Sequence, residues 1–177
     1  MDWIGMHRLF AATLFAALFQ AFFSLPSPAA AQEQRFIGQF RDWVLYTYVD
    51  DGDKLCFITS EPTDQDGNYT RRGPPAPLVT RLPGDPPTVE VSYQPGYSYL
   101  ADSDVTMRID DNSYTLFTQG EHAWANNGDD DGIVAAMKAG QRMTVRGTST
   151  KETWSEDSYS LLGFTRAYNA MVEACAG

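Results

Sequence analysis

Short runs of β-branched and aromatic residues, each closed by a turn, recur along most of the chain. Over residues 105–109, apolar and polar side chains alternate with the period of a half-buried strand. Residues 43–60 predict a hairpin whose turn is Asp50–Asp53. Further strands are predicted over 78–82, 88–93, 114–118, 143–148 and 154–162. About eight short strands at this spacing predict one mainly β domain, an antiparallel β-sandwich or barrel.

Two short helices are predicted among these strands. The first covers residues 132–139, follows the acids Asp129–Asp131 and stops before a glycine, which is the usual order of charges and caps. The second, near the C-terminus, has apolar residues at helical spacing from Phe164 and ends near Cys175. Residues 61–77 are rich in proline and glycine and predict a long loop.

The first 31 residues have the composition of a secretory signal peptide. Arg8 precedes the uncharged run Leu9–Leu25, a proline pair follows, and Ala29–Ala31 offers the small residues that a signal peptidase reads. An uncleaved membrane anchor is the competing interpretation, because the run is just long enough to span a bilayer. We expect cleavage after Ala31, which leaves residues 32–177 as a single β-sandwich domain without stable membrane insertion. We expect that domain in the periplasm, with secretion or outer-membrane association as further destinations.

The charge of the chain argues against one class of partner. Thirteen Lys and Arg against 23 Asp and Glu give a net charge of −10 at pH 7. A surface of this sign repels phosphate backbones, so we expect no nucleic-acid partner. Removal of residues 1–31 takes one charge of each sign, so the predicted mature domain stays equally acidic.

Cys56 and Cys175 are the only two thiols. In an oxidising compartment they allow one pairing, and we expect a disulfide that ties an early strand to the C-terminus. The competing interpretation is a free or reactive thiol, which would need a resolving cysteine or a histidine partner nearby. No C-x-x-C motif is present to supply the first of these.

His122 is the only histidine outside the predicted signal peptide, so a Ser-His-Asp or Cys-His arrangement must use it. No G-x-S-x-G elbow is present to supply a serine nucleophile. Two cysteines and one histidine that do not cluster give no zinc motif. We therefore expect no catalytic residues, no metal and no cofactor, with a hydrolase that uses His122 as a distant alternative.

Three acidic clusters, Asp50–Asp53, Asp64–Asn68 and Asp129–Asp131, could each offer oxygen ligands to calcium. None of them has the spacing of an EF-hand loop. Turn formation and helix capping explain all three without a metal.

Exposed aromatic and basic residues are the remaining candidates for a contact surface. Arg71 and Arg72 form an adjacent basic pair in the Pro/Gly-rich loop, and Tyr97 and Tyr99 are spaced to share a face. Exposed tyrosines make protein or carbohydrate contacts, whereas buried ones fill a core. We predict that Arg71, Arg72, Tyr97 and Tyr99 form a contact surface; the alternatives are core packing for the tyrosines and ion pairing for the arginines.

Several short motifs occur in order from residue 42 to residue 175. They are Asp42-Trp43-Val44-Leu45-Tyr46-Thr47, Cys56 with Ser60-Glu61-Pro62, Arg71-Arg72-Gly73 with Val79-Thr80, Gly96-Tyr97-Ser98-Tyr99, Ala123-Trp124, Gly147-Thr148-Ser149, Asp157-Ser158-Tyr159-Ser160-Leu161, Gly163-Phe164-Thr165-x-Ala167 and Cys175. On these motifs the chain resembles the invasion-associated locus B family, exported proteins of Gram-negative bacteria. The resemblance implies an immunoglobulin-like β-sandwich, an envelope location and, in pathogenic members, an association with host-cell invasion. It implies no enzymatic activity and no catalytic residues.

The expected function follows from the missing catalytic set and this resemblance. We expect a non-enzymatic exported protein of a Gram-negative envelope that acts through contacts with another envelope protein or a host protein. A periplasmic module that binds a small ligand or calcium is the alternative.

Overall fold

A computed structural model of the chain describes residues 33–176. The predicted signal peptide, residues 1–31, lies outside the described residues. Within them, eleven strands and two helices alternate with short turns. The strands are β1 (Arg35–Phe40), β2 (Trp43–Asp50), β3 (Asp53–Ser60), β4 (Asp64–Gly67), β5 (Ala76–Leu82), β6 (Thr88–Gln94), β7 (Asp104–Ile109), β8 (Asn112–Gln119), β9 (His122–Ala125), β10 (Arg142–Thr148) and β11 (Trp154–Ser160). The helices are α1 (Asp130–Ala139) and α2 (Phe164–Ala174).

Every strand pairing is antiparallel, and the strands form one hydrogen-bonded sheet in the order β1-β2-β3-β5-β6-β9-β8-β7-β10-β11-β4. The sheet folds back on itself, because Tyr93 of β6 contacts Tyr159 of β11 although four strands separate β6 and β11 in this order. Two layers therefore face each other, which confirms the prediction of a mainly β, immunoglobulin-like sandwich with two helices.

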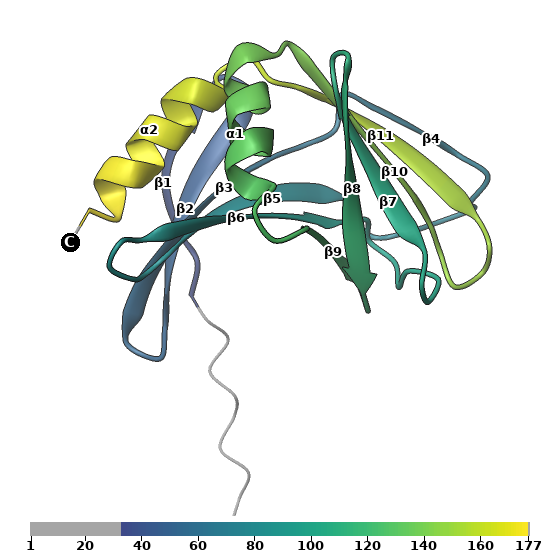
Figure 1. The fold of residues 1–177 in the computed structure, drawn as a ribbon, viewed down its shortest axis with the longest axis horizontal. Helices are drawn as coiled ribbons and strands as arrows, with labels where there is room; N and C mark the ends of the chain where they lie inside the picture. The colour runs from purple at the N-terminus through teal and green to yellow at the C-terminus, as the bar shows by residue number, and fades with distance from the viewer. Residues whose placement is uncertain (1–32, 177) are drawn as a thin grey trace, which may run out of the picture. The chain divides into compact units, whose positions relative to one another are not determined.

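The core lies between the inward faces of these layers. Trp43 and Leu45 of β2, Val145 of β10 and Phe164 of α2 are all fully buried within it. Both helices lie on the same side of β2, β3, β5 and β6 (Figure 1). The Asp130 side chain accepts a hydrogen bond from the backbone N–H of Val91 at 2.8 Å, so the first turn of α1 is tied to β6. Neither helix in residues 33–176 is long and apolar enough to cross a membrane.

Three strands were not predicted from the sequence: β1, β4 and β9. β4 lies inside the predicted loop 61–77 and reads Asp-Gln-Asp-Gly, which has low strand propensity. It forms because the edge of β11 offers it backbone partners from Ser155 to Ser158. The prediction of a continuous loop there was wrong for that reason, since pairing outweighed propensity.

Candidate functional site

The two cysteines form the predicted disulfide, which joins Cys56 of β3 to Cys175 at the end of α2. Their Cα atoms are 6.1 Å apart, an ordinary spacing for a disulfide. Both thiols are therefore consumed, and the described residues contain no free cysteine. Lys54 also donates a hydrogen bond from Nζ to the carbonyl oxygen of Ala174. Lys54 and Cys56 of β3 therefore both hold the end of the C-terminal helix.

The structure places Arg72 in the interior instead of on a contact surface. Its side chain is 3% exposed and pairs with Asp157 of β11, whose side chain is 0% exposed. One guanidinium nitrogen lies 2.7 Å from Asp157 Oδ2, and the other donates to Oδ1. The guanidinium also donates to the carbonyl oxygen of Pro95 at 3.0 Å and to Gln65 Oε1 at 3.1 Å. These contacts realise the ion-pairing alternative and remove Arg72 from the predicted contact surface.

The other predicted contact residues are divided between core and surface. Tyr99 is only 4% exposed, so it belongs to the core and the prediction is corrected for it too. Tyr97 is half-buried, with its hydroxyl 2.8 Å from Ser155 Oγ and its ring edge-on to Tyr99. Arg71 is exposed. The structure therefore does not assemble these four side chains into one outer surface.

Three buried tyrosines surround the Arg72–Asp157 pair: Tyr93, Tyr99 and Tyr159. Tyr93 donates a hydrogen bond to Asp157, and its hydroxyl lies 3.2 Å from that of Tyr159. Burial is the main reason that the pKa of each of the three phenols is raised, because a tyrosinate would lose its hydration. The Tyr99 hydroxyl has no hydrogen-bond partner among the described residues. This cluster is a structural centre that holds neutral phenols around one ion pair.

His122 lies at the start of β9, where its ring stacks on Trp124 at a centroid distance of 5.2 Å. It makes no hydrogen bond to a serine or threonine among the described residues, as a catalytic arrangement would require. The acidic clusters have local structural contacts: Asp66 accepts from the N–H of Gly67, and Asn68 accepts from the N–H of Trp154. In residues 33–176 no group of three or more His, Cys, Asp or Glu is placed to hold a metal ion.

The strand register reveals an outer surface that we call the aromatic face. It is the side of β1, β2, β3, β5, β6, β9 and β8 that points away from the core. Directly opposed residues of antiparallel strands project to the same side, so the register identifies its members. The chain of opposed pairs is Phe36–Tyr46, Tyr46–Phe57, Phe57–Thr80, Thr80–Glu90, Leu78–Ser92, Ser92–Trp124 and Trp124–Phe117.

Aromatic side chains gather at both ends of this face. On β1–β3, Tyr46 stacks on Phe57 at 5.5 Å between ring centroids and meets the edge of Phe36 at 5.9 Å. On β8–β9, Trp124 stacks with Phe117 at 5.8 Å. Phe117 is 46% exposed, and Phe36 is more exposed still.

Polar residues lie between the two aromatic groups. Thr80, Ser92 and Glu90 come from the paired strands β5 and β6. Burial raises the pKa of Glu90, and the nearby Asp130 raises it further while His122 opposes the shift. Thr80 and Ser92 are buried and Glu90 is half-buried, so the exposed apolar area of the aromatic face lies at its two ends.

Part of the aromatic face could be recognised from the sequence. Tyr46 and Tyr48 are two residues apart on one strand and so share a side. Their connection to Trp124 and Phe117 depends on the pairing order of six strands, from β2 to β8 in the sheet, including the unpredicted β9. That order is a property of the tertiary fold, so alternation within single strands could not supply it.

The chain matches the family model described as Invasion associated locus B (IalB) protein over residues 43–172. The chain belongs to the invasion associated locus B family. The match runs from the first residue of β2 into α2, so it includes Arg72, Asp157 and most of the aromatic face. Cys175 lies just beyond it.

A solved structure shares the fold of this family member. The crystal structure of invasion associated protein B from Bartonella henselae superposes with a TM-score of 0.54 at 16% sequence identity, covering 77% of this chain and 95% of that one. Identity at this level supports the fold alone. Comparison with curated proteins gave no match.

Proposed function

We propose that this protein is an exported, non-enzymatic component of a Gram-negative envelope that acts by binding another protein through the aromatic face. Membership of the invasion associated locus B family supports an envelope role, and the solved relative is itself described as invasion associated. The Cys56–Cys175 disulfide supports an oxidising compartment such as the periplasm. The predicted signal peptide agrees with that destination.

The observation that carries the proposal is the exposure of aromatic side chains on an outer sheet surface. Phe36 and Phe117 are exposed at opposite ends of the aromatic face, each against a less exposed ring, Tyr46 and Trp124. Exposed apolar patches mark interaction surfaces in soluble proteins, and aromatic residues are enriched where proteins bind each other.

The charge of the protein favours one kind of partner. Glu90 and Glu121 lie on or beside the aromatic face, and the chain as a whole carries a net charge of −10. A second copy would bring the same acidic charge to the interface and be repelled. The expected partner is therefore a different envelope protein with an apolar patch bordered by lysine or arginine.

The state of the reactive residues also favours binding over catalysis. Both cysteines are in the disulfide, and the His122 ring is stacked on Trp124. Neither arrangement presents an activated nucleophile.

Site-specific photo-crosslinking in intact cells tests the proposal. A crosslinking amino acid at Phe117 is compared with one at Leu162, an apolar residue that is 59% exposed and lies after β11, outside the aromatic face. We expect an adduct with one envelope protein from position 117 and none from position 162. Calorimetry with that purified partner should then show at least a tenfold weaker affinity for Phe117→Ala, an unchanged affinity for Leu162→Ala, and weaker binding at high salt.

Three results would contradict the proposal. Adducts of the chain only with itself would indicate a homodimer, and adducts only with glycan or with a host protein would indicate another class of partner. Equal affinities of the purified partner for the Phe117→Ala and Leu162→Ala variants would place the contact elsewhere.

A further inference from the structure

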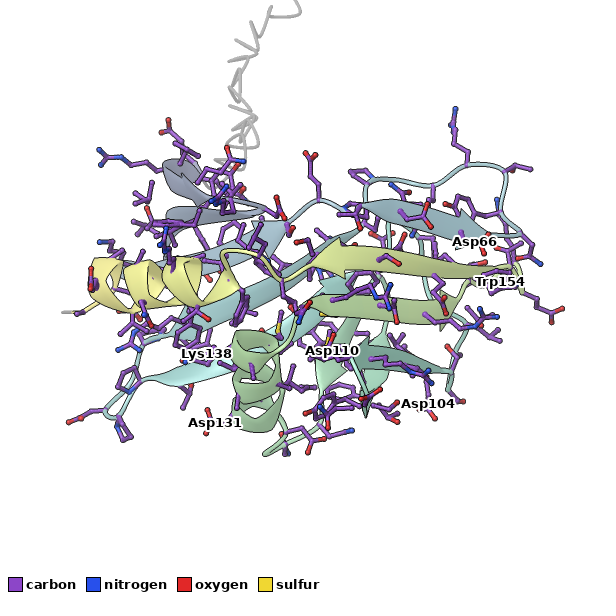
Figure 2. The ribbon with its side chains drawn as sticks, turned by 90° about the horizontal axis from the view of Figure 1, so that it is seen from above. Asp66, Asp104, Asp110, Asp131, Lys138 and Trp154 are labelled. Carbon is purple, nitrogen blue, oxygen red and sulfur yellow. A yellow bond between two sulfur atoms is a disulfide. The ribbon has the colours of Figure 1, made fainter. Side chains whose placement is uncertain are left out.

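A second outer surface lies on β7, β10 and β11, on the side of these strands that faces away from the core. Inward positions such as Met107, Met143 and Val145 are fully buried. The intervening positions project outward because side chains alternate along a strand. Figure 2 looks onto this side of the molecule, with Asp110 labelled near one end of the strands and Trp154 near the other. The outward residues line a polar depression of about 540 Å³.

Three arginines surround one threonine in this depression. Arg108 of β7 is directly opposite Thr144 of β10. Arg142 and Arg146 flank Thr144 along β10, each two residues away and so on the same side of the strand, at about 7 Å along it. The long side chains of all three can therefore converge above the Thr144 hydroxyl.

The acids in the depression do not cancel these charges fully. Asp110 accepts hydrogen bonds from the backbone N–H groups of Gln141 at 3.0 Å and Arg142 at 3.1 Å, so its carboxylate fastens the start of β10. Glu156 pairs with Arg146 at 3.6 Å, with both side chains half-exposed. A pair of this length and exposure is weak.

The remaining two guanidiniums have no partner within the described part of the chain. Neither Arg108 nor Arg142 forms a side-chain hydrogen bond or ion pair there. Both are exposed, and both point to the same side as the hydroxyls of Thr144 and Ser158, which are opposed across β10 and β11. Two unpaired guanidiniums beside two hydroxyls form an unusual group on a protein whose net charge is −10.

We propose that Arg108, Arg142 and Thr144 form a binding site for a phosphate or sulfate group carried on a sugar. A guanidinium presents parallel N–H donors that match two oxygens of such a group, and a hydroxyl can satisfy a third. Arg146 closes one side of the site, held in place over the Trp154 ring at 4.0 Å. The volume of about 540 Å³ exceeds what an isolated oxyanion needs and lies in the range of small-ligand sites, while the polar lining suits sugar hydroxyls.

Acidic residues limit where the ligand can lie. β4 pairs with the far edge of β11 and places Asp66 opposite Glu156 and Asp64 opposite Ser158. An oxyanion is repelled from this edge and should therefore lie over β7 and β10. The site is distinct from the aromatic face, which ends at β8.

The test is a titration of the mature protein, monitored by backbone amide chemical shifts, with inorganic phosphate, inorganic sulfate, glucose 6-phosphate and glucose. We expect glucose 6-phosphate to shift the amides of residues 106–108 and 142–146, glucose to shift none, and added NaCl to weaken binding. The variant Arg108→Gln/Arg142→Gln should lose at least tenfold in affinity. Arg166→Gln, which removes an exposed arginine of α2, should bind as the parent protein does.

The separate ligands identify the form in which the group is bound. Tighter binding of glucose 6-phosphate than of both inorganic ions supports the sugar-borne group. Equal binding of the inorganic ions and the sugar phosphate would overturn that part and leave a site for free oxyanions. Two results would overturn the site altogether. One is the absence of amide shifts with any anion at 20 mM, roughly the weakest dissociation constant of interest. The other is an affinity of the Arg108→Gln/Arg142→Gln variant equal to that of the parent protein.

Discussion

The buried pair of Arg72 and Asp157 allows the sharpest test of how this sandwich is held together. Replacement by Arg72→Met keeps much of the side-chain volume. It leaves a carboxylate that is 0% exposed and whose remaining side-chain donor is the neutral Tyr93 hydroxyl. Removal of one partner from a buried pair costs about 3–5 kcal/mol, because the other charge stays desolvated. We expect a fall of this size in the free energy of unfolding.

The measurement is chemical and thermal denaturation of the oxidised mature protein, followed by circular dichroism. For a domain of this length the loss corresponds to a fall of about 10–15 °C in Tm. The neighbouring Arg71→Met is the matched control: Arg71 is exposed, so its replacement should change stability by at most about 0.5 kcal/mol.

A double variant separates charge burial from simple loss of packing. In Arg72→Met/Asp157→Asn the uncompensated charge is gone, and the amide oxygen of the new side chain can still accept from Tyr93. The double variant should therefore be more stable than Arg72→Met alone. The reasoning is refuted if Arg72→Met is no more destabilising than Arg71→Met, or if the two substitutions in the pair are simply additive.

Three further predictions concern the same domain. Removal of the disulfide by Cys56→Ser/Cys175→Ser should cost about 4–5 kcal/mol by chain entropy, given a sequence separation of 119 residues; reductant should lower the Tm of the parent protein and leave that of the variant unchanged. Gly163→Ala should destabilise by more than Gly52→Ala in urea denaturation, because both glycines have φ above +90° but only at Gly163 would the added Cβ lie 2.0 Å from a backbone oxygen; equal effects would contradict the clash. The three buried tyrosines have raised pKa values, so the stability they contribute is complete below pH 10 and is lost as the pH rises beyond that value. Absorbance at 295 nm should show them ionising only together with unfolding, and their reversible ionisation in a folded protein near pH 10 would contradict this.

The fold class could be predicted from the sequence because the local alternation of apolar and polar residues and the turn residues agree with the final structure. The hairpin of β2 and β3, the alternating strand β7 and both helices were predicted within a few residues. The sequence predicted too few strands because some strands form through pairing with a neighbour and not through their own propensity. β4 has little propensity of its own, and β9 has only four residues.

The candidate sites were harder to predict because a side chain's exposure depends on residues far away in the sequence. Arg72 looked like a surface cation in a Pro/Gly-rich loop, and its partner Asp157 lies 85 residues further along the chain. Nothing local distinguishes Arg71 from Arg72, and the folded structure exposes one and buries the other. The disulfide was predictable because only two cysteines exist and one pairing was available.

The ion pair also explains why the two outer surfaces can differ so much in chemistry. Arg72 bonds both to Asp157 of β11 and to the carbonyl oxygen of Pro95 directly after β6, so it joins the two layers from inside the sandwich. With the layers held by the core, the disulfide and this pair, outward positions of each layer carry little of the packing energy. Strands β1 and β8 can therefore expose the aromatic rings of Phe36 and Phe117, while β7 and β10 expose arginines. The two sites share no residue, and Phe117 is opposite Asp104 of β7, four residues along that strand from Arg108. A substitution in one site should therefore leave binding at the other unchanged, which makes a protein contact and an oxyanion contact separable within one small domain.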